Sequence, residues 1–352
     1  MISGRDEAGF LPSPAGRGIE GEGALNHFAN VSSRKAGNSG YRIVPVLLFC
    51  TCAAAQSYPS KPVRYIMPTT GASELVGRIV AQGMSEVLGQ QVFVDVRSGA
   101  GGNLGAEIAA KTAPDGYSLL QITQAHTVNV TLFKSLGYDV VRDFTPITKA
   151  DISPLIVVVH PSLPVKNIGE LVRIAKAKPG AINYGSAGVG TSTYLAAELF
   201  KIVAGVNLLE VPYRGGAPAQ TAVIAGEVSV YFAPIATALP FVKDRRLRAL
   251  AVGTAKRLPL LPEYPTVAES GYPEYEASNW HGLVVPAKTP KEIIATLHAA
   301  AIAALKKPEI SKRMFDLGLT PVGDTPEEFA AFIRADIEKW RKIVQQKGIT
   351  AE

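Results

Sequence analysis

Three short segments of this sequence combine glycine with serine or threonine directly after an apolar run, at residues 69–73, 98–103 and 186–192. Small residues let backbone N–H groups approach a ligand closely, and a helix that begins just after them adds partial positive charge. Any one of these segments could be an ordinary tight turn. Three of them in one chain predict an anion-binding site that needs no lysine or arginine side chain.

Patterns typical of enzymes, nucleotide-binding loops and metal sites are missing beyond residue 55. That part of the sequence has no cysteine and no Gly-x-Ser-x-Gly, Ser-x-x-Lys or His-Glu-x-x-His pattern. Its glycine-rich segments lack the lysine of a P-loop and the glycine spacing of a dinucleotide fingerprint. Its histidines show no metal-ligand spacing. We therefore predict that the protein is not an enzyme, with no catalytic residue, metal ligand or cofactor.

The segments that must position these loops alternate between short apolar strands and amphipathic helices. Strands are predicted at residues 63–67, 92–96, 118–123, 155–159, 182–185, 208–212, 228–232, 248–252 and 282–285. Helices are predicted at residues 74–88, 104–113, 167–178, 191–204 and, after a turn, within 215–226. Two further helices are expected to open with Thr-Pro-x-Glu capping boxes at 289–292 and 325–328. This alternation predicts an α/β fold with a mostly parallel sheet, in which ligands bind at the carboxyl ends of the strands.

The first 55 residues differ from the rest. Residues 1–33 carry no apolar period, and we expect a non-structural extension produced by a start codon placed too early. Residues 34–55 join a basic flank, a short apolar run and an Ala-x-Ala site, which is typical of a secretory signal peptide. The run is too short for a membrane span, which needs about 20 residues. The pattern predicts export, and hence a periplasmic protein.

Bulk composition sets further limits. A length of 352 residues with 47% hydrophobic residues favours two globular domains. The net charge of +6 suits an anionic ligand. The densest basic cluster, at residues 243–248, has no interleaved aromatic residues, so we expect no nucleic-acid partner.

A set of ordered motifs extends over residues 58–349. The motifs are Tyr-Pro-x-Lys-Pro at 58–62, Pro-Asp-Gly-Tyr at 114–117, His-Thr-Val-Asn at 126–129, Asp-Phe-Thr-Pro at 143–146, Gly-Ser-Ala-Gly-Val-Gly-Thr-Ser at 185–192 and Pro-Tyr-Arg-Gly-Gly-Ala-Pro-Ala at 212–219. In these motifs the chain resembles the substrate-binding receptors of the tripartite tricarboxylate transporter family, the Bug-type periplasmic receptors.

The resemblance implies a type II periplasmic-binding-protein fold, in which two α/β lobes are joined by a two-strand hinge. The first lobe would comprise residues 57–156 and 280–352, and the second residues 157–279. The segments 155–159 and 282–285 would cross between them. The resemblance also implies a small carboxylate ligand in the cleft, a monomeric receptor, and membrane permease subunits of a tripartite transporter as partners.

Family receptors hold the carboxylate largely through backbone N–H groups of two loops, and the matching positions lie at 69–73 and 186–192. The predicted ligand-binding residues are Thr69, Thr70, Gly71, Ala72, Ser73, His126, Asn129, Ser186, Gly188, Gly190, Thr191, Ser192 and Ala233.

This chain departs from the family pattern twice. Its first turn is two residues shorter than usual, with a Thr69–Thr70 hydroxyl pair and with Glu74 where aspartate is common. Ala233 stands where an aspartate commonly follows the strand, so a partner for an ammonium group is missing. We therefore expect a di- or tricarboxylate or an aromatic acid as ligand, in place of an amino acid.

Other interpretations stay open at this point. The same fold and ligand would serve a signalling receptor that contacts a sensor-kinase ectodomain. The shortened turn would also fit a paralogue that has lost its ligand. An enzyme assembled from residues distant in sequence is the remaining alternative.

Overall fold

The computed structural model describes residues 58–349, so the predicted extension at 1–33 and signal segment at 34–55 lie outside the described residues. The strands are β1 (Val63–Met67), β2 (Val92–Val96), β3 (Ser118–Thr123), β4 (Phe144–Val159), β5 (Asn183–Ser186), β6 (Leu209–Pro212), β7 (Val230–Pro234), β8 (Arg248–Val252), β9 (Ser278–Pro286) and β10 (Thr320–Pro321). The helices are α1 (Ala72–Leu88), the 3-10 turn η1 (Ala100–Gly102), α2 (Asn103–Ala110), α3 (Gln124–Leu132), α4 (Ile168–Ala177), α5 (Ser192–Ala204), α6 (Gly216–Ala225), α7 (Ile235–Lys243), α8 (Lys291–Lys306), α9 (Pro308–Asp316) and α10 (Pro326–Lys347). Within 58–349, no helix has both the length and the apolar character needed to cross a bilayer.

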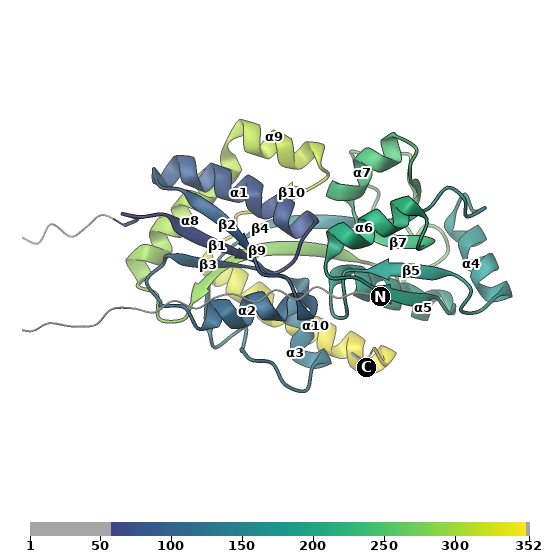
Figure 1. Cartoon of the computed structure of the whole chain (residues 1–352), viewed down its shortest axis with the longest axis horizontal. Helices are drawn as coiled ribbons and strands as arrows, with labels where there is room; N and C mark the ends of the chain where they lie inside the picture. Colours follow the sequence, from purple (N-terminus) through teal and green to yellow (C-terminus); the bar gives the residue numbers. More distant parts are fainter. Residues whose placement is uncertain (1–57, 350–352) are drawn as a thin grey trace, which may run out of the picture. The chain divides into compact units, whose positions relative to one another are not determined.

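The strands follow one path, β2-β1-β3-β9-β4-β7-β5-β6, and β8 and β10 each pair with β4 (Figure 1). At one end of the path β1 runs parallel to β2 and β3, and at the other end β5 runs parallel to β6 and β7. In between, β9 is antiparallel to β3 and β4, and β4 is antiparallel to β7. The prediction of parallel strands is confirmed at both ends and wrong in the middle.

Strand β4 is much longer than the strand predicted at 155–159. Its first part, to Pro154, pairs with β9, whereas residues 155–159 pair with β7 and β8. The prediction missed the first part because Pro146 and Pro154 interrupt the apolar run, and proline is normally excluded from central strands. The ladder shifts register directly after Pro146 and again after Lys149, and Pro154 is the last residue of β4 that pairs with β9. Strand β4 therefore belongs to a first sheet, with β1, β2, β3, β9 and β10, and also to a second sheet, with β5–β8.

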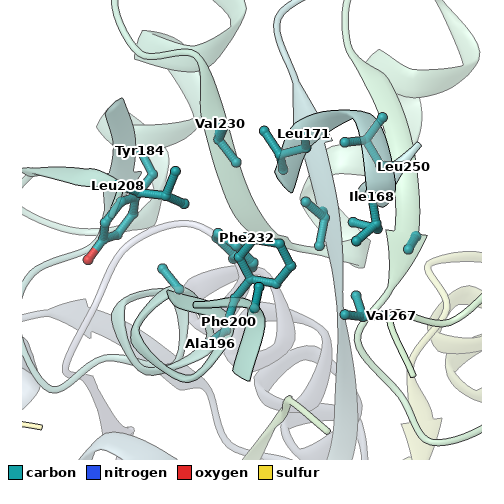
Figure 2. Close-up of a cluster of buried hydrophobic side chains, with 14 of the residues drawn as sticks. Ile168, Leu171, Tyr184, Ala196, Phe200, Leu208, Val230, Phe232, Leu250 and Val267 are labelled. Carbon is teal, nitrogen blue, oxygen red and sulfur yellow. The ribbon is translucent and has the colours of Figure 1, made fainter. Parts of the chain in front are cut away.

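Helices cover both faces of each sheet (Figure 1). On the first sheet, α1, α8 and α9 share one apolar core, and α2 and α10 share another with Trp280 and Phe329. On the second sheet, α4 and α5 pack around Phe200 and Phe232, whose ring centroids are 5.4 Å apart (Figure 2). Helices α6 and α7 cover its other face. Burial on both faces explains why so many strands are continuous apolar runs.

The two predicted capping boxes have different outcomes. At α10 the Thr325 side chain accepts from the Glu328 N–H and the Glu328 carboxylate accepts from the Thr325 N–H, which confirms the box. The box at α8 is wrong, because α8 begins after Pro290 with no side-chain cap. Thr289 is buried, and its hydroxyl donates instead to the Pro286 carbonyl oxygen at 2.7 Å.

Candidate functional site

Five helices begin around one small pocket of about 40 Å³, which we call the deep pocket. Its lining residues are Thr69, Thr70, Ala72, Ser73, Thr123, Ala125, Ala187, Thr191, Ser192, Thr193, Gly216, Tyr231, Pro234 and Asn279. An outer pocket of about 490 Å³ adjoins it, since Thr69 and Ala187 line both. The outer pocket is also lined by Ser98, Gly99, Ala100, Gly101, Gly102, Phe133, Gly188, Val189, Tyr213, Arg214 and Gly215. Together the pockets form a cleft between loops that follow strands of the first sheet and loops that follow strands of the second.

The five helix starts give the deep pocket its electrostatic character. The pocket is lined at the first residues or N-caps of α1, α3, α5, α6 and α7. Of these five described helices only α3 has a side-chain cap, whereas α1, α5, α6 and α7 begin without one. The first N–H groups of a helix have no partner within the helix and carry its positive dipole end. Several such ends at one pocket favour an anion.

Hydroxyl groups add further donors. The Thr70 Oγ1 and Tyr231 hydroxyl atoms are buried and have no hydrogen-bond partner among the described residues. Leaving such a group unpaired costs about 1–3 kcal/mol, so a ligand that accepts from it is favoured. The Ser73 hydroxyl is oriented by a buried hydrogen bond, because Gln121 Nε2 donates to Ser73 Oγ at 2.7 Å. Tyr65 in turn donates to Gln121 Oε1 at 3.1 Å. Since Ser73 Oγ already accepts, its own proton is left to donate to a ligand.

Charge is confined to the outer pocket. None of the described residues that line the deep pocket carries a formal charge. The outer pocket has one cationic lining residue, Arg214, which is exposed and forms no ion pair with another described residue. A pocket interior lined by helix dipoles, with Arg214 at its wider part, suits an acid that has a second anionic group.

The two sides of the cleft touch at glycines. A methyl group built on Gly71 would lie 3.1 Å from the Ala217 backbone nitrogen, and one on Gly101 would lie 2.5 Å from the Val189 carbonyl oxygen. Gly190, at φ +81°, faces the Asn129 side chain on α3. Each pair joins a loop or helix of the first sheet to a loop or helix start of the second. The structure therefore describes the cleft with its walls in contact.

Seven of the predicted ligand-binding residues line this cleft. Thr69, Thr70, Ala72, Ser73, Thr191 and Ser192 line the deep pocket, and Gly188 lines the outer pocket. The shortened first turn still forms a wall of the cleft. The hydroxyl pair of Thr69 and Thr70 that distinguishes this chain lies at the pocket itself.

The other six predicted residues line neither pocket. His126 is fully buried, and its Nδ1 accepts from the Thr123 N–H at 3.0 Å as part of the α3 capping box. Burial lowers the pKa of His126 to about 4. Asn129 donates to Asn103 Oδ1 at 2.9 Å, and Ser186 donates to Glu210 Oε1 at 2.5 Å. Ala233 is buried in an apolar core of the second sheet. Gly71 and Gly190 form the wall contacts described above.

Several lining residues escaped the sequence analysis as site residues. Arg214, Gly215 and Gly216 lie in the Pro-Tyr-Arg-Gly-Gly motif, which was available as a signal. Tyr231 and Asn279 have no local signature, because each reaches the pocket from a strand whose position depends on the whole sheet order.

Comparison with known proteins gives a consistent result. A family model described as "Tripartite tricarboxylate transporter family receptor" matches residues 76–349. Protein BugT of Bordetella pertussis is 32% identical over 299 residues, covering 84% of this chain and 92% of BugT. A protein of R. palustris solved with adipate is 33% identical with a TM-score of 0.81, covering 83% of this chain and 99% of that one. MatC from Rhodopseudomonas palustris, solved with bound malate, is 29% identical with a TM-score of 0.78, covering 82% and 100%.

Proposed function

We propose that this chain, which belongs to the tripartite tricarboxylate transporter receptor family, captures a small carboxylate in the deep pocket for a transporter of that type. The fold is that of the two-lobed periplasmic binding proteins, and the family consists of solute-binding receptors. We place the receptor outside the cytoplasmic membrane, with permease subunits as its partner.

One observation carries this proposal. Five helices begin at a pocket of about 40 Å³, four of them without a side-chain cap among the described residues, and no described lining residue is charged. Unpaired N–H groups and the buried hydroxyls of Thr70 and Tyr231 are all donors, so the group that completes them is an acceptor. A carboxylate offers two acceptor oxygens and a negative charge in a volume of that size.

The outer pocket argues for a second acidic group on the ligand. Its volume of about 490 Å³ leaves room for a chain of several carbon atoms beyond the deep pocket. Arg214 at its wall supplies the only formal charge among the described lining residues of either pocket. The adipate and malate bound by the two R. palustris proteins are both dicarboxylates, which supports the same class for this chain.

The first test is binding by the purified protein. We expect di- or tricarboxylates to raise its melting temperature, because a ligand at a hundredfold excess over Kd adds about 2.7 kcal/mol of stability. Thermal-shift assays with dicarboxylates, tricarboxylates, aromatic acids and amino acids would identify the class, and calorimetry would give Kd. A folded protein that responds to none of the acids would overturn the proposal.

A second prediction concerns Arg214. We expect Arg214→Gln to weaken adipate binding by about fivefold to tenfold, because an exposed charged hydrogen bond contributes only about 1 kcal/mol. Hexanoate, which lacks the second carboxylate, should bind the variant and the wild type equally.

Calorimetry with both acids at low and physiological salt checks this prediction, and the loss of adipate affinity should shrink as salt screens the charge. Arg173→Gln on the exposed part of α4 is the charge-matched control. Equal weakening for both acids would contradict a role in binding the distal carboxylate.

A further inference from the structure

Among the described side-chain atoms of the deep pocket that have no hydrogen-bond partner, Asn279 Oδ1 is the one that can accept but not donate. Asn279, on β9, lines the pocket and is only 6% exposed. Its Oδ1 is buried and has no hydrogen-bond partner among the described residues. Ser153 stands opposite Asn279 in the β4–β9 ladder, and its hydroxyl is likewise without a described partner, so it does not satisfy this oxygen.

Two buried side chains fix the orientation of the Asn279 amide. His281 Nδ1 lies 2.8 Å from Asp151 Oδ1, and His281 Nε2 lies 3.2 Å from Asn279 Nδ2. Both Asp151 and His281 are fully buried. The three side chains form a hydrogen-bonded series that leads from the interior of the first sheet to the wall of the pocket.

The donor and acceptor properties of these three side chains determine the direction of each hydrogen bond between them. An ionised carboxylate only accepts, so the proton of the imidazole lies on Nδ1. In the neutral imidazole Nε2 is then an acceptor, and it faces Nδ2 because the amide nitrogen only donates. With Nδ2 held by His281, the amide oxygen Oδ1 is left for the pocket. Asp151 and His281 thus act through Asn279 and need not touch a ligand.

We propose that Asn279 is a specificity residue that selects carboxylates carrying a hydroxyl on the carbon next to the bound carboxyl group, and that Asp151 and His281 are its positioning residues. The inference rests on the proposed carboxylate-binding function. The surrounding donors bind the carboxylate, and Asn279 Oδ1 accepts from the hydroxyl. The pocket of about 40 Å³ requires the two groups to be adjacent.

A hydroxyl fits this acceptor better than an ammonium group. No aspartate or glutamate is among the described lining residues of either pocket. Asp151 lies behind His281, which already occupies its Oδ1. An ammonium group would therefore enter a pocket of helix N-termini with only a neutral amide to receive it, and burying a charge without a partner is unfavourable.

Calorimetry with matched acids tests the inference. The probes are malate against succinate, and 2-hydroxyadipate against adipate, so each pair differs by one hydroxyl. We expect wild-type protein to bind the hydroxylated member of the better-bound pair about tenfold more tightly, because a satisfied buried acceptor is worth about that much. Asn279→Leu should bring the ratio close to one. Asn207→Leu, at an exposed position, is the matched control and should keep the wild-type ratio.

The positioning role has its own variant. Replacing both members of the buried pair, Asp151→Leu with His281→Leu, avoids leaving an unpaired charge, which the single changes would do. The Asn279 amide is then free to turn, so the hydroxyl preference should fall while plain acids still bind. Loss of stability alone would not change this ratio. If the double variant does not fold, the Asn279→Leu measurement still decides the specificity role.

The outcomes are distinct. Wild-type protein that binds each plain acid as tightly as its hydroxylated partner would overturn the inference and leave the carboxylate receptor standing. A tenfold preference that survives in Asn279→Leu would also overturn it. A preference lost in Asn279→Leu but kept in the double variant would overturn the positioning role. Protein that binds none of the four acids would overturn this inference together with the proposed dicarboxylate function.

Discussion

Gly190→Ala is expected to weaken ligand binding by roughly 100-fold while the protein still folds, an effect of about 3 kcal/mol on binding. Gly190 lies in the loop before α5, at φ +81°. A methyl group there would overlap Asn129 Oδ1 and lie 3.1 Å from Asn129 Cγ. The added methyl would therefore hold the two walls of the cleft apart, and a ligand enclosed by both would lose one of them.

Asn129 cannot easily move away from such a methyl group. Its Nδ2 donates to Asn103 Oδ1 at 2.9 Å, and Asn103 Oδ1 also accepts from the Tyr138 hydroxyl at 2.8 Å. All three residues are buried, so shifting Asn129 would leave polar groups unpaired. Separating the walls relieves the overlap with no such loss, which is why binding should be affected more than stability.

Gly205→Ala is the matched control. Gly205 also has a positive φ, +62°, but nothing lies within 4 Å of a methyl group at that position. Both variants carry a similar backbone strain, of about 1 kcal/mol. Only Gly190→Ala should change the Kd measured by calorimetry, whereas urea unfolding without ligand should be similar for the two. Wild-type affinity in Gly190→Ala would mean that contact between these walls is not needed for binding.

The part of the site that the sequence predicted is the part built from local composition. Glycine beside serine or threonine before a helix marks a helix start without a bulky side chain, and the loops at 69–73 and 186–192 have this role. The loop at 98–103 lines the outer pocket for the same reason. The helix starts at α6 and α7 were missed as parts of the pocket, since their place depends on β7 lying between β4 and β5.

Residues that reach the pocket from strands could not be predicted locally. Asn279 faces the cleft only because β9 pairs with both β3 and β4, which are separated in sequence from it by more than a hundred residues. His126 was predicted as a ligand-binding residue from a family motif. In the structure its side chain occupies the third position of a capping box that begins at Thr123, where glutamate or glutamine is usual. That spacing was a readable signal for a structural role.

The role of His126 in the α3 cap leads to the second large prediction, which concerns stability in acid. Burial lowers the pKa of His126 from 6.5 to about 4, so the folded protein binds fewer protons than the unfolded chain between those values. Stability from this residue is complete above about pH 6.5 and is lost as the pH falls toward 4. A shift of this size corresponds to about 3 kcal/mol, because each pKa unit contributes 1.36 kcal/mol.

The variant His126→Gln separates the effect of His126 protonation from the effect of the α3 capping box. Glutamine at this position can accept from the Thr123 N–H as Nδ1 does, and it stays neutral at every pH. We expect the free energies of unfolding of the variant and the wild type to differ by a constant above pH 6.5. Between pH 6.5 and 4 the wild type should lose about 3 kcal/mol more than the variant, as measured by urea unfolding at a series of pH values.

Because Asp336 and Glu210 have raised pKa values in both proteins, their contributions cancel in the difference. Parallel acid slopes for wild type and His126→Gln would contradict a buried neutral imidazole beneath the cleft wall.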